Sequence, residues 1–264
     1  MIALKNKERG QTLLIVVLIM VIALTVGLSV ATRSIVNLRT STEEAASQKA
    51  LAAAEAGIEQ ALSTNTPVSG VFSANIIYNT SSAEVKGDRF LLNAGNPLLK
   101  NDGVDLWLSD YSTNESELYD NRRSGTVTIY WGEDDSCKNA ALEIAVIEAG
   151  ALPNWKNDAV IKKYAVDPCV ARRSNNFDAS VAGDTILTKP LQHSYSITVS
   201  SGIVARIIPI YFDAVIGISS TVSLPSQGFE IESTGEAGGT ERKVTVFKGY
   251  PRIPSEFFPY NLFE

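Results

Sequence analysis

Histidine is nearly absent from this chain of 264 residues, in which His193 is the only one. A metal site built from several histidines is therefore impossible, and any catalytic Ser-His or Cys-His pair would have to use His193. Ser194 follows His193 directly, but adjacency in the sequence does not create a nucleophile–base geometry. Because the chain also lacks the G-x-S-x-G, Walker A, G-x-G-x-x-G and C-x-x-C patterns, we expect no enzymatic activity, no cofactor and no metal site.

Basic residues are in the minority and are scattered along the chain. Lys and Arg number 23 against 29 Asp and Glu, which gives a net charge of -6. A surface for nucleic acid is therefore not expected. With 45% hydrophobic and 20% charged residues the chain is too apolar to be disordered, and its length allows one or two domains.

Acidic residues gather in one stretch, residues 101–121, which contains no Lys or Arg. Oxygen ligands of this kind bind Ca²⁺, but no spacing here matches an EF-hand loop. A solvated acidic surface is the favoured interpretation, with calcium binding as the open alternative. The acidic residues of this stretch are Asp102, Asp105, Asp110, Glu115, Glu117 and Asp120.

The N-terminal part of the chain contains a long uncharged run. The 23 residues between Arg9 and Arg33 carry no charge, and from Leu13 to Ala31 nearly all are aliphatic. A helix of that length spans about 30 Å, which is the thickness of a bilayer core. The run is longer than the apolar region of a signal peptide, so we expect a transmembrane helix over 11–32.

The charges that flank this run predict its orientation. Lys5, Lys7 and Arg9 against Glu8 give residues 1–10 a side-chain charge of 3 − 1 = +2. By the positive-inside rule this short tail stays in the cytoplasm and the rest of the chain is exported. The expected location is a single-pass protein of the cytoplasmic (inner) membrane.

Helical periodicity continues past the membrane run. Apolar residues recur at steps of three and four from Ile35 to Leu62, and the stretch ALAAAEAGIEQAL is rich in alanine, the best helix former. Pro67 disfavours helical backbone just before it, so the helix is predicted to end near 63–65. Residues 33–65 are thus predicted to continue the helix as an amphipathic half.

From residue 66 onward the pattern changes to that of strands, with β-branched and aromatic segments between Gly, Pro, Asn and Ser clusters. The predicted fold class is α+β, with a long N-terminal helix packed on a β-rich antiparallel head domain over 66–264. Within it, 67–124 is predicted to be loop-rich, before a regular sheet that begins at Gly125. The predicted strands are 125–131, 141–148, 159–166, 195–201, 204–212, 227–233 and 241–247, with weaker candidates at 71–78, 88–93 and 104–109.

Residues 6–64 combine a charged leader ending in KNKERG, a Gly10–Gln11 junction, an uninterrupted apolar helix and the continuation QKALAAAEAGIEQAL. This combination resembles the type IV pilin superfamily, and within it the minor pilins with a PilX-type N-terminal region. The resemblance implies that a prepilin peptidase removes residues 1–10 by cutting after Gly10 and then methylates Gln11.

The resemblance also implies two successive environments for the apolar helix. Membrane lipid surrounds it first, and the pilus assembly platform then pulls the subunit into a filament with major and other minor pilins. The same apolar surface suits both surroundings, because lipid and helix packing both satisfy it. Residues expected in this membrane and filament-core surface include Leu13, Ile15, Leu18 and Ile22.

Two positions depart from the family pattern. Gln11 stands where most members begin the mature chain with Phe or Met, and Ile15 occupies the fifth mature position, where major pilins carry Glu. The missing Glu argues against a major subunit, so we expect a minor pilin at low copy that initiates or caps a type IV pilus at the cell surface. The alternatives are a minor pseudopilin of a type II secretion system and a signal-anchored surface protein with a ligand-binding β-domain.

The only two cysteines, Cys137 and Cys169, lie in the part expected to be exported. In an oxidising compartment they can pair and close a loop of about 33 residues. Two buried free thiols are the alternative.

Overall fold

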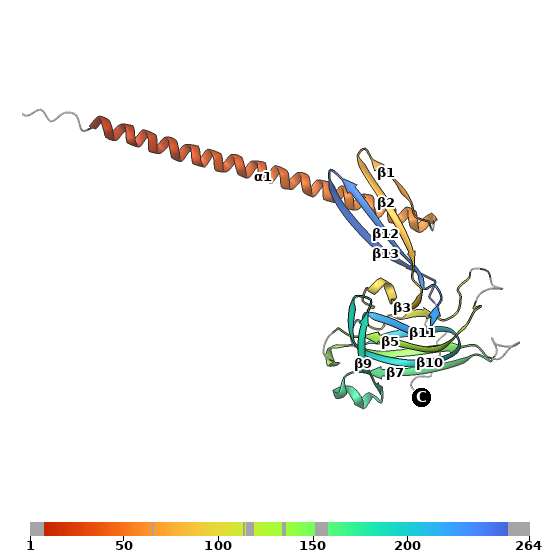
Figure 1. The fold of residues 1–264 in the computed structure, drawn as a ribbon. Coiled ribbons are helices and arrows are strands. Elements are labelled where there is room, and N and C mark those ends of the chain that lie inside the picture. The colour runs from red at the N-terminus through yellow and green to blue at the C-terminus, as the bar shows by residue number, and fades with distance from the viewer. Residues whose placement is uncertain are drawn as a thin grey trace, which may run out of the picture. The chain divides into compact units, whose positions relative to one another are not determined.

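The structure, a computed structural model, combines one long helix with β-sheets and so has the α+β fold expected from the sequence (Figure 1). It describes residues 8–64, 66–112, 114, 119–133, 136–150 and 158–252. The chain divides into two compact units. Unit 1 comprises residues 1–63, 68–80 and 233–244, and unit 2 comprises 64–67, 81–232 and 245–264.

Helix α1 runs without interruption from Glu8 to Thr64 (Figure 1). The predicted end near 63–65 is confirmed, and its cause is local, because Pro67 follows and no proline lies inside the helix. The first seven residues of the expected leader lie outside the described residues.

Unit 1 contains most of a four-stranded sheet with the strand order β1-β2-β12-β13. Both of its hairpins turn at residues with positive φ: Asn75 (61°) between the first two strands, and Gly238 (56°) with Gly239 (77°) between the last two. The single strand predicted at 71–78 is therefore wrong, because Asn75 reverses the chain within it. The strands are β1 Ser69–Ser73, β2 Ile76–Glu84, β12 Gly228–Ala237 and β13 Thr240–Gly249.

Unit 2 contains a nine-stranded sheet with the order β3-β11-β5-β10-β6-β7-β8, in which β4 and β9 also pair with β10. These pairs are antiparallel except for the short parallel pair of β7 and β8. The strands are β3 Gly87–Leu91, β4 Val104–Trp107, β5 Arg123–Trp131, β6 Ala141–Glu148, β7 Val160–Asp167, β8 Asp178–Ala179, β9 Val181–Ile186, β10 Lys189–Ile210 and β11 Ile216–Leu224.

Strand β10 links the two halves of this sheet. Residues 193–202 pair with β5, whereas 202–210 pair with β6. The sequence predicted two strands here, at 195–201 and 204–212, because Ser201 and Gly202 resemble a turn. Instead β10 continues through them with a local irregularity. Ser201 has a left-handed φ of 51°, and the pairing register shifts at the point where the partner changes from β5 to β6.

The core of unit 2 follows the two-residue alternation of its central strands. Val127, Ile129 and Trp131 of β5 are at most 1% exposed and pack with Leu142 and Ile144 of β6 in one apolar cluster. Burying each such side chain contributes about 1.5–3 kcal/mol. The Trp131 Nε1–H donates to the Ala140 carbonyl at 2.8 Å, so its one polar atom is satisfied inside the core.

Three predictions about the β-rich part need correction. The segment 67–124, expected to be loop-rich, holds β1 to β4. Strands β9 and β11 were not predicted, because Gly and Asp interrupt VAGDTI and because Gly and three Ser interrupt IGISSTVSL. They form strands by pairing with β10 and β5. The head expected as one domain over 66–264 is divided between the two units, and β2, β12 and β13 contribute residues to both.

Candidate functional site: the apolar helix and its contact with the sheet

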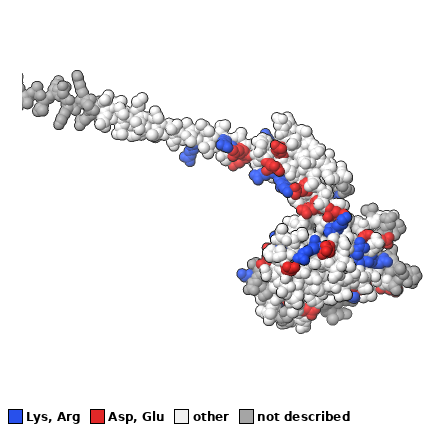
Figure 2. All heavy atoms as spheres, viewed as in Figure 1, with Lys and Arg blue, Asp and Glu red and all other residues white. Residues whose placement is uncertain are grey.

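The first half of α1 presents an apolar surface that carries no charged residue from Leu13 to Thr32. The large apolar side chains from Leu13 to Leu38 are 53–71% exposed, so nothing in the described chain covers them. Residues 13–32 include no Lys, Arg, Asp or Glu, and in Figure 2 the white stretch of the helix next to the grey atoms shows no blue or red atoms. The predicted residues Ile15, Leu18 and Ile22 share one helix face, since they stand at positions i, i+3 and i+7.

Two hydroxyl groups within this half bond back to the helix backbone. The hydroxyl of Thr25 donates to the Ile22 carbonyl at 2.8 Å, and that of Thr32 donates to the Leu28 carbonyl at the same distance. Backbone groups are bonded within the helix itself. In hydrocarbon each unsatisfied polar group costs several kcal/mol, so these bonds favour placement of the two hydroxyls in a membrane. The helix is long and apolar enough to cross a membrane.

The predicted processing residues lie near the start of this helix. Gly10 and Gln11 belong to α1, which begins at Glu8. Gly27 lies farther along the apolar half and has no atom within 4 Å of the position that a Cβ would take. A larger residue at Gly27 would therefore meet open space in the isolated subunit.

The second half of α1 packs on the sheet of unit 1 through small residues. These residues recur at steps of three and four along one helix face, and all of them are buried. Side chains of this size let a helix approach a sheet closely. The stripe consists of Ala50, Ala53, Ala54, Gly57 and Ala61.

Gly57 marks the tightest point on the helix side of this contact. A Cβ there would lie 2.4 Å from Ser233 Oγ and 2.9 Å from Tyr78 Cδ2, distances that real Cβ atoms do not show. The Ser233 hydroxyl is fully buried and has no hydrogen-bond partner in the described structure. The close approach of helix and sheet thus leaves a polar group unsatisfied.

Two polar contacts accompany the small-residue stripe. The Tyr78 hydroxyl of β2 donates to Gln60 Oε1, and the Arg242 Nε–H of β13 donates to Ser47 Oγ at 2.8 Å. Because the two acceptors stand 13 positions apart on the helix, the bonds hold both its rotation and its register on the sheet.

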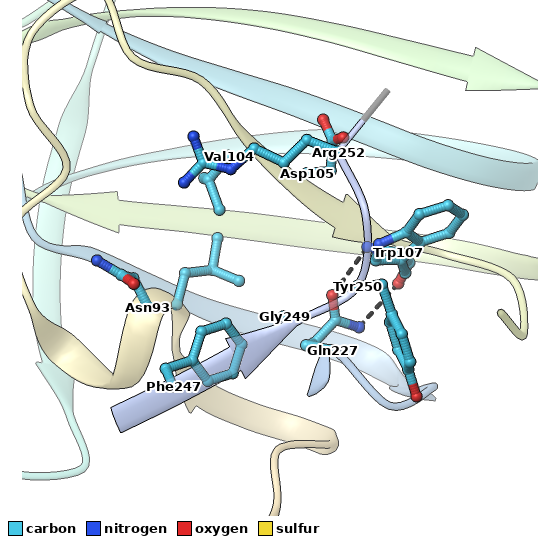
Figure 3. A pocket seen from close by; sticks show the side chains of 10 residues that line it. Asn93, Val104, Asp105, Trp107, Gln227, Phe247, Gly249, Tyr250 and Arg252 are labelled. Atoms are coloured by element: carbon cyan, nitrogen blue, oxygen red, sulfur yellow. Dashed lines mark hydrogen bonds between the residues drawn. The ribbon is translucent and has the colours of Figure 1, made fainter. Parts of the chain in front are cut away.

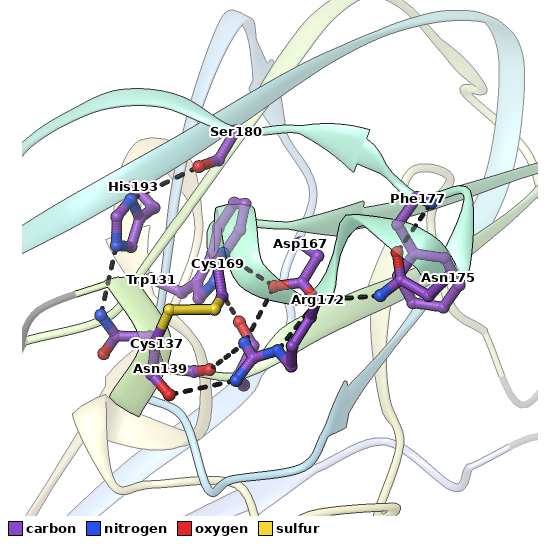
Figure 4. Close-up of polar contacts among 11 residues, drawn as sticks. Trp131, Cys137, Asn139, Asp167, Cys169, Arg172, Asn175, Phe177, Ser180 and His193 are labelled. Atoms are coloured by element: carbon purple, nitrogen blue, oxygen red, sulfur yellow. Dashed lines mark hydrogen bonds and ion pairs between the residues drawn. A yellow bond between two sulfur atoms is a disulfide. The ribbon is translucent and has the colours of Figure 1, made fainter.

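The two cysteines form a disulfide in unit 2 (Figure 4). It joins Cys137 of the short helix η2 (Ser136–Lys138) to Cys169, which directly precedes the short helix η3 (Val170–Asn175). A hydrogen-bonded group centred on Arg172 of η3 lies beside it. The Arg172 guanidinium donates to both oxygens of Asp167, at 2.8 and 3.0 Å, and to the carbonyls of Cys137 and Asn139. The disulfide and this ion pair therefore fix the same corner of the unit.

The carboxyl of Asp167 is completely buried. Burial raises its pKa, but hydrogen bonds from Arg172, from the Cys169 backbone N–H and from Asn175 outweigh this effect. The net result is a pKa below the usual value for Asp. The carboxylate is therefore held in its charged form by the donors around it.

Three of the six acidic residues in the stretch 101–121 form ion pairs with arginines that lie outside it. Asp102 pairs with Arg252, Asp105 with Arg206 and Asp110 with Arg123. Among the described residues no group of three or more His, Cys, Asp or Glu side chains is placed to hold a metal ion. Glu115 and Glu117 lie outside the described residues.

His193 has ordinary structural neighbours (Figure 4). Its Nε2 lies 3.2 Å from Asn139 Nδ2, and its Nδ1 lies 3.4 Å from Ser180 Oγ. The second distance exceeds the reach of about 2.6–3.2 Å expected between a base and a nucleophile. The hydroxyl of Ser194 donates instead to the Ala182 carbonyl at 2.8 Å.

Comparisons with protein-family models, with curated proteins and with solved structures returned no match to this chain.

Proposed function

We propose that this chain is a minor pilin-like structural subunit of a type IV pilus, assembled at low copy, that initiates or caps the filament. The observation that carries the proposal is the division of α1 into an apolar half, uncharged from Leu13 to Thr32 and with its large side chains more than half exposed, and a half packed on a sheet through small residues. The first half of such a helix offers an apolar surface to lipid or to other helices, and the second half attaches it to the folded β-rich part of the chain.

In this proposal a prepilin peptidase processes the subunit on the cytoplasmic side of the inner membrane. It removes residues 1–10, whose side-chain charge of +2 keeps them in the cytoplasm, and methylates Gln11. Both β-rich units are then exported, and the disulfide between Cys137 and Cys169 suits an oxidising compartment. The role is structural and requires no catalysis by this chain.

The assembly platform next moves the subunit from lipid into a filament of major and other minor pilins. Helix-on-helix contacts through Ile15, Leu18 and Ile22 replace lipid contacts, at little cost because both surroundings are apolar. Ile15 offers no carboxylate to the N-terminus of a neighbouring subunit. This absence restricts the subunit to low copy near the filament tip.

Two other functions would also use the apolar first half of α1 as a membrane anchor. A minor pseudopilin of a type II secretion system would share the leader processing but assemble with secretion components. A signal-anchored surface protein with a ligand-binding β-domain would keep its N-terminal residues, because no prepilin peptidase would act on it.

N-terminal mass spectrometry of the membrane-extracted protein tests the proposal. We expect a mature chain that begins with methylated Gln11. Gly10→Val should block processing, since a β-branched side chain obstructs the approach of a peptidase to the backbone. Gly27→Val is the matched control, because Gly27 lies in the same helix and faces open space, and processing should continue. Recovery of residues 1–10 on the protein in sheared filaments would refute the assignment.

A further inference from the structure

Unit 2 contains a cavity of about 220 Å³ beside the end of β13 (Figure 3). Pockets for drug-sized ligands measure about 300–1,000 Å³, so this cavity has room for a single six-membered ring. It is lined by aromatic and by polar side chains. The lining residues used below are the aromatic Trp107, Phe247 and Tyr250 and the polar Asn93, Asp105 and Arg252.

The part of the lining formed by Trp107 and Tyr250, called the aromatic wall below, is held in place before any ligand arrives. Gln227 accepts from the Trp107 backbone N–H at 2.8 Å and donates to the Trp107 carbonyl at 2.9 Å, as Figure 3 shows. Tyr250 lies edge-on to the Trp107 ring, with centroids 6.2 Å apart, and stacks on Tyr111 at 4.3 Å. A fixed wall of this kind reduces the entropy lost on binding.

The part of the lining that contains Asn93 stores backbone strain. Asn93 (φ 52°, ψ 36°) and Ala94 (φ 51°, ψ 30°) are both left-handed, and Gly95 follows with φ 76°. Left-handed helical backbone costs an L-residue such as Ala roughly 1–2 kcal/mol. Strain of this kind clusters at ligand sites, where the surrounding structure holds a side chain in a required position. Here it holds the Asn93 amide at the cavity wall.

The polar groups of the site offer both donors and acceptors but no net charge. Arg252 has five N–H groups, and Nη1 donates to Asp102 at 2.7 Å. The Asp105 carboxylate is paired with Arg206 through bonds of 2.7 and 2.8 Å. Two arginines and two aspartates cancel, so the charges favour a neutral ligand that carries hydroxyl groups.

We propose that this cavity binds a neutral pyranose residue of a glycan. A pyranose has an apolar face of C–H groups, which suits Tyr250 and Phe247, and a rim of hydroxyls, which suits Arg252, Asn93 and Asp105. This inference goes beyond the filament role and does not depend on it, because every residue of the site belongs to unit 2.

The test is a binding titration of the full-length chain in a polyoxyethylene detergent, because detergents with sugar heads would compete. The probes are neutral hexose and N-acetylhexosamine oligosaccharides, with uronate oligosaccharides as the charged comparison. Saturation-transfer NMR identifies the bound ring protons, and tryptophan fluorescence gives the dissociation constant. We expect saturable binding of at least one neutral oligosaccharide, and weaker binding of the uronates.

Variants then locate the binding. Tyr250→Ala should weaken it about tenfold, whereas Tyr250→Phe, which keeps the ring, should stay within about twofold. Arg252→Ala, at an exposed side chain, should also weaken binding without unfolding the unit. The matched control is Phe212→Ala, which removes an exposed aromatic ring of unit 2 that does not line the cavity and should change nothing.

Three results would overturn the proposal. One is the absence of saturable binding to every neutral oligosaccharide, or binding of uronates alone. Another is equal affinity of wild type and Tyr250→Ala with a normal melting curve. The third is Tyr250-dependent binding of an aromatic peptide in place of any sugar, which would identify the cavity as a peptide site.

Discussion

Gly235 of β12 lies directly against the backbone of α1 at Ala50. A Cβ built on Gly235 would stand 2.0 Å from the Ala50 carbonyl oxygen and 2.6 Å from the Ala54 nitrogen. Strand backbone and helix backbone thus touch with no side chain between them. Because both neighbours are backbone atoms, they cannot move aside as a flexible side chain would, and only glycine fits.

Gly235→Ala should therefore push the helix away from the sheet of unit 1. We expect a loss of about 1–3 kcal/mol in the stability of this contact, which is the usual range for overpacking. Hydrogen exchange of the β12 amides in the full-length chain measures it. Glu236→Ala is the control, because the neighbouring side chain is exposed and its removal should leave exchange unchanged. Unaltered exchange in Gly235→Ala would show that the contact is looser than described.

Ser233→Ala should raise the stability of the same contact. The hydroxyl is buried without a partner, and leaving such a group unsatisfied costs about 1–3 kcal/mol. We expect a gain of about 1 kcal/mol, seen as slower exchange of the β12 amides. Ser233→Thr adds a methyl group beside Gly57 and should have the opposite effect. A loss of stability in Ser233→Ala would mean that the hydroxyl has a partner.

Removal of the disulfide should destabilise unit 2. The half-cystines are separated by 32 positions, and closing a loop of that length contributes about 3–4 kcal/mol in the chain-entropy model. The double variant Cys137→Ala/Cys169→Ala avoids a stray thiol and should lower the unfolding free energy by this amount. Chemical unfolding with and without reductant gives the comparison. Reductant should weaken the wild type and leave the double variant unaffected.

Acid should weaken unit 2 through Asp167. Its pKa is lower in the folded protein than in the unfolded chain, so the unfolded state binds more protons as pH falls. The stabilisation is complete above the unfolded value of about 3.9 and is lost as pH falls through the folded pKa. Melting temperatures between pH 2 and 6 should drop steeply below about pH 4.

Asp167→Asn should flatten that acid dependence. It should also lower stability at pH 7 by about 3–5 kcal/mol, because Arg172 loses its buried partner. Asp184→Asn is the control: Asp184 also has a lowered pKa, caused first by its bond from Arg89, but the pair is solvent-exposed. Its loss should have little effect. An unchanged acid profile in Asp167→Asn would remove Asp167 as the cause.

The extent of the helix could be predicted because its causes are local. Residues three and four positions apart establish α1, and Pro67 lies just beyond its end. The face of α1 that packs on the sheet, from Ala50 to Ala61, was harder to predict. Its alanines favour a helix in any surroundings and so do not indicate what the helix contacts. Its significance depends on Gly235, which is distant in the sequence and meets Ala50 only in the folded chain.

The division into two units and the cavity were beyond prediction for a related reason. A boundary between domains usually shows as a linker, but here it crosses β2, β12 and β13 within the strands. The pairing of Asp102 with Arg252 joins positions 150 residues apart, so the acidic stretch 101–121 has partners that its own sequence does not reveal. Alternation predicts which strand residues are buried but not which strands become neighbours.

The last prediction concerns Ile15 and rests on the proposed filament role. A charge without a partner inside an apolar filament core costs several kcal/mol. With Ile15 the subunit cannot compensate the positive N-terminus of a neighbour, so incorporation along the shaft is disfavoured and a place near the tip remains. Immunogold labelling of filaments should therefore show the protein at one end. Labelling along the whole shaft, at the stoichiometry of the major subunit, would contradict this placement.

Ile15→Glu supplies the missing carboxylate and should spread the label along the shaft. Ile22→Glu is the matched control: it puts the same charge on the same helix face seven positions later, away from the N-terminus of a neighbour, and should reduce insertion. If both variants keep the label at the tip, charge pairing is not the restriction, and the bulk of the β-rich units excludes the subunit from the shaft instead. N-terminal processing, which does not depend on Ile15, would then still test the pilin assignment separately.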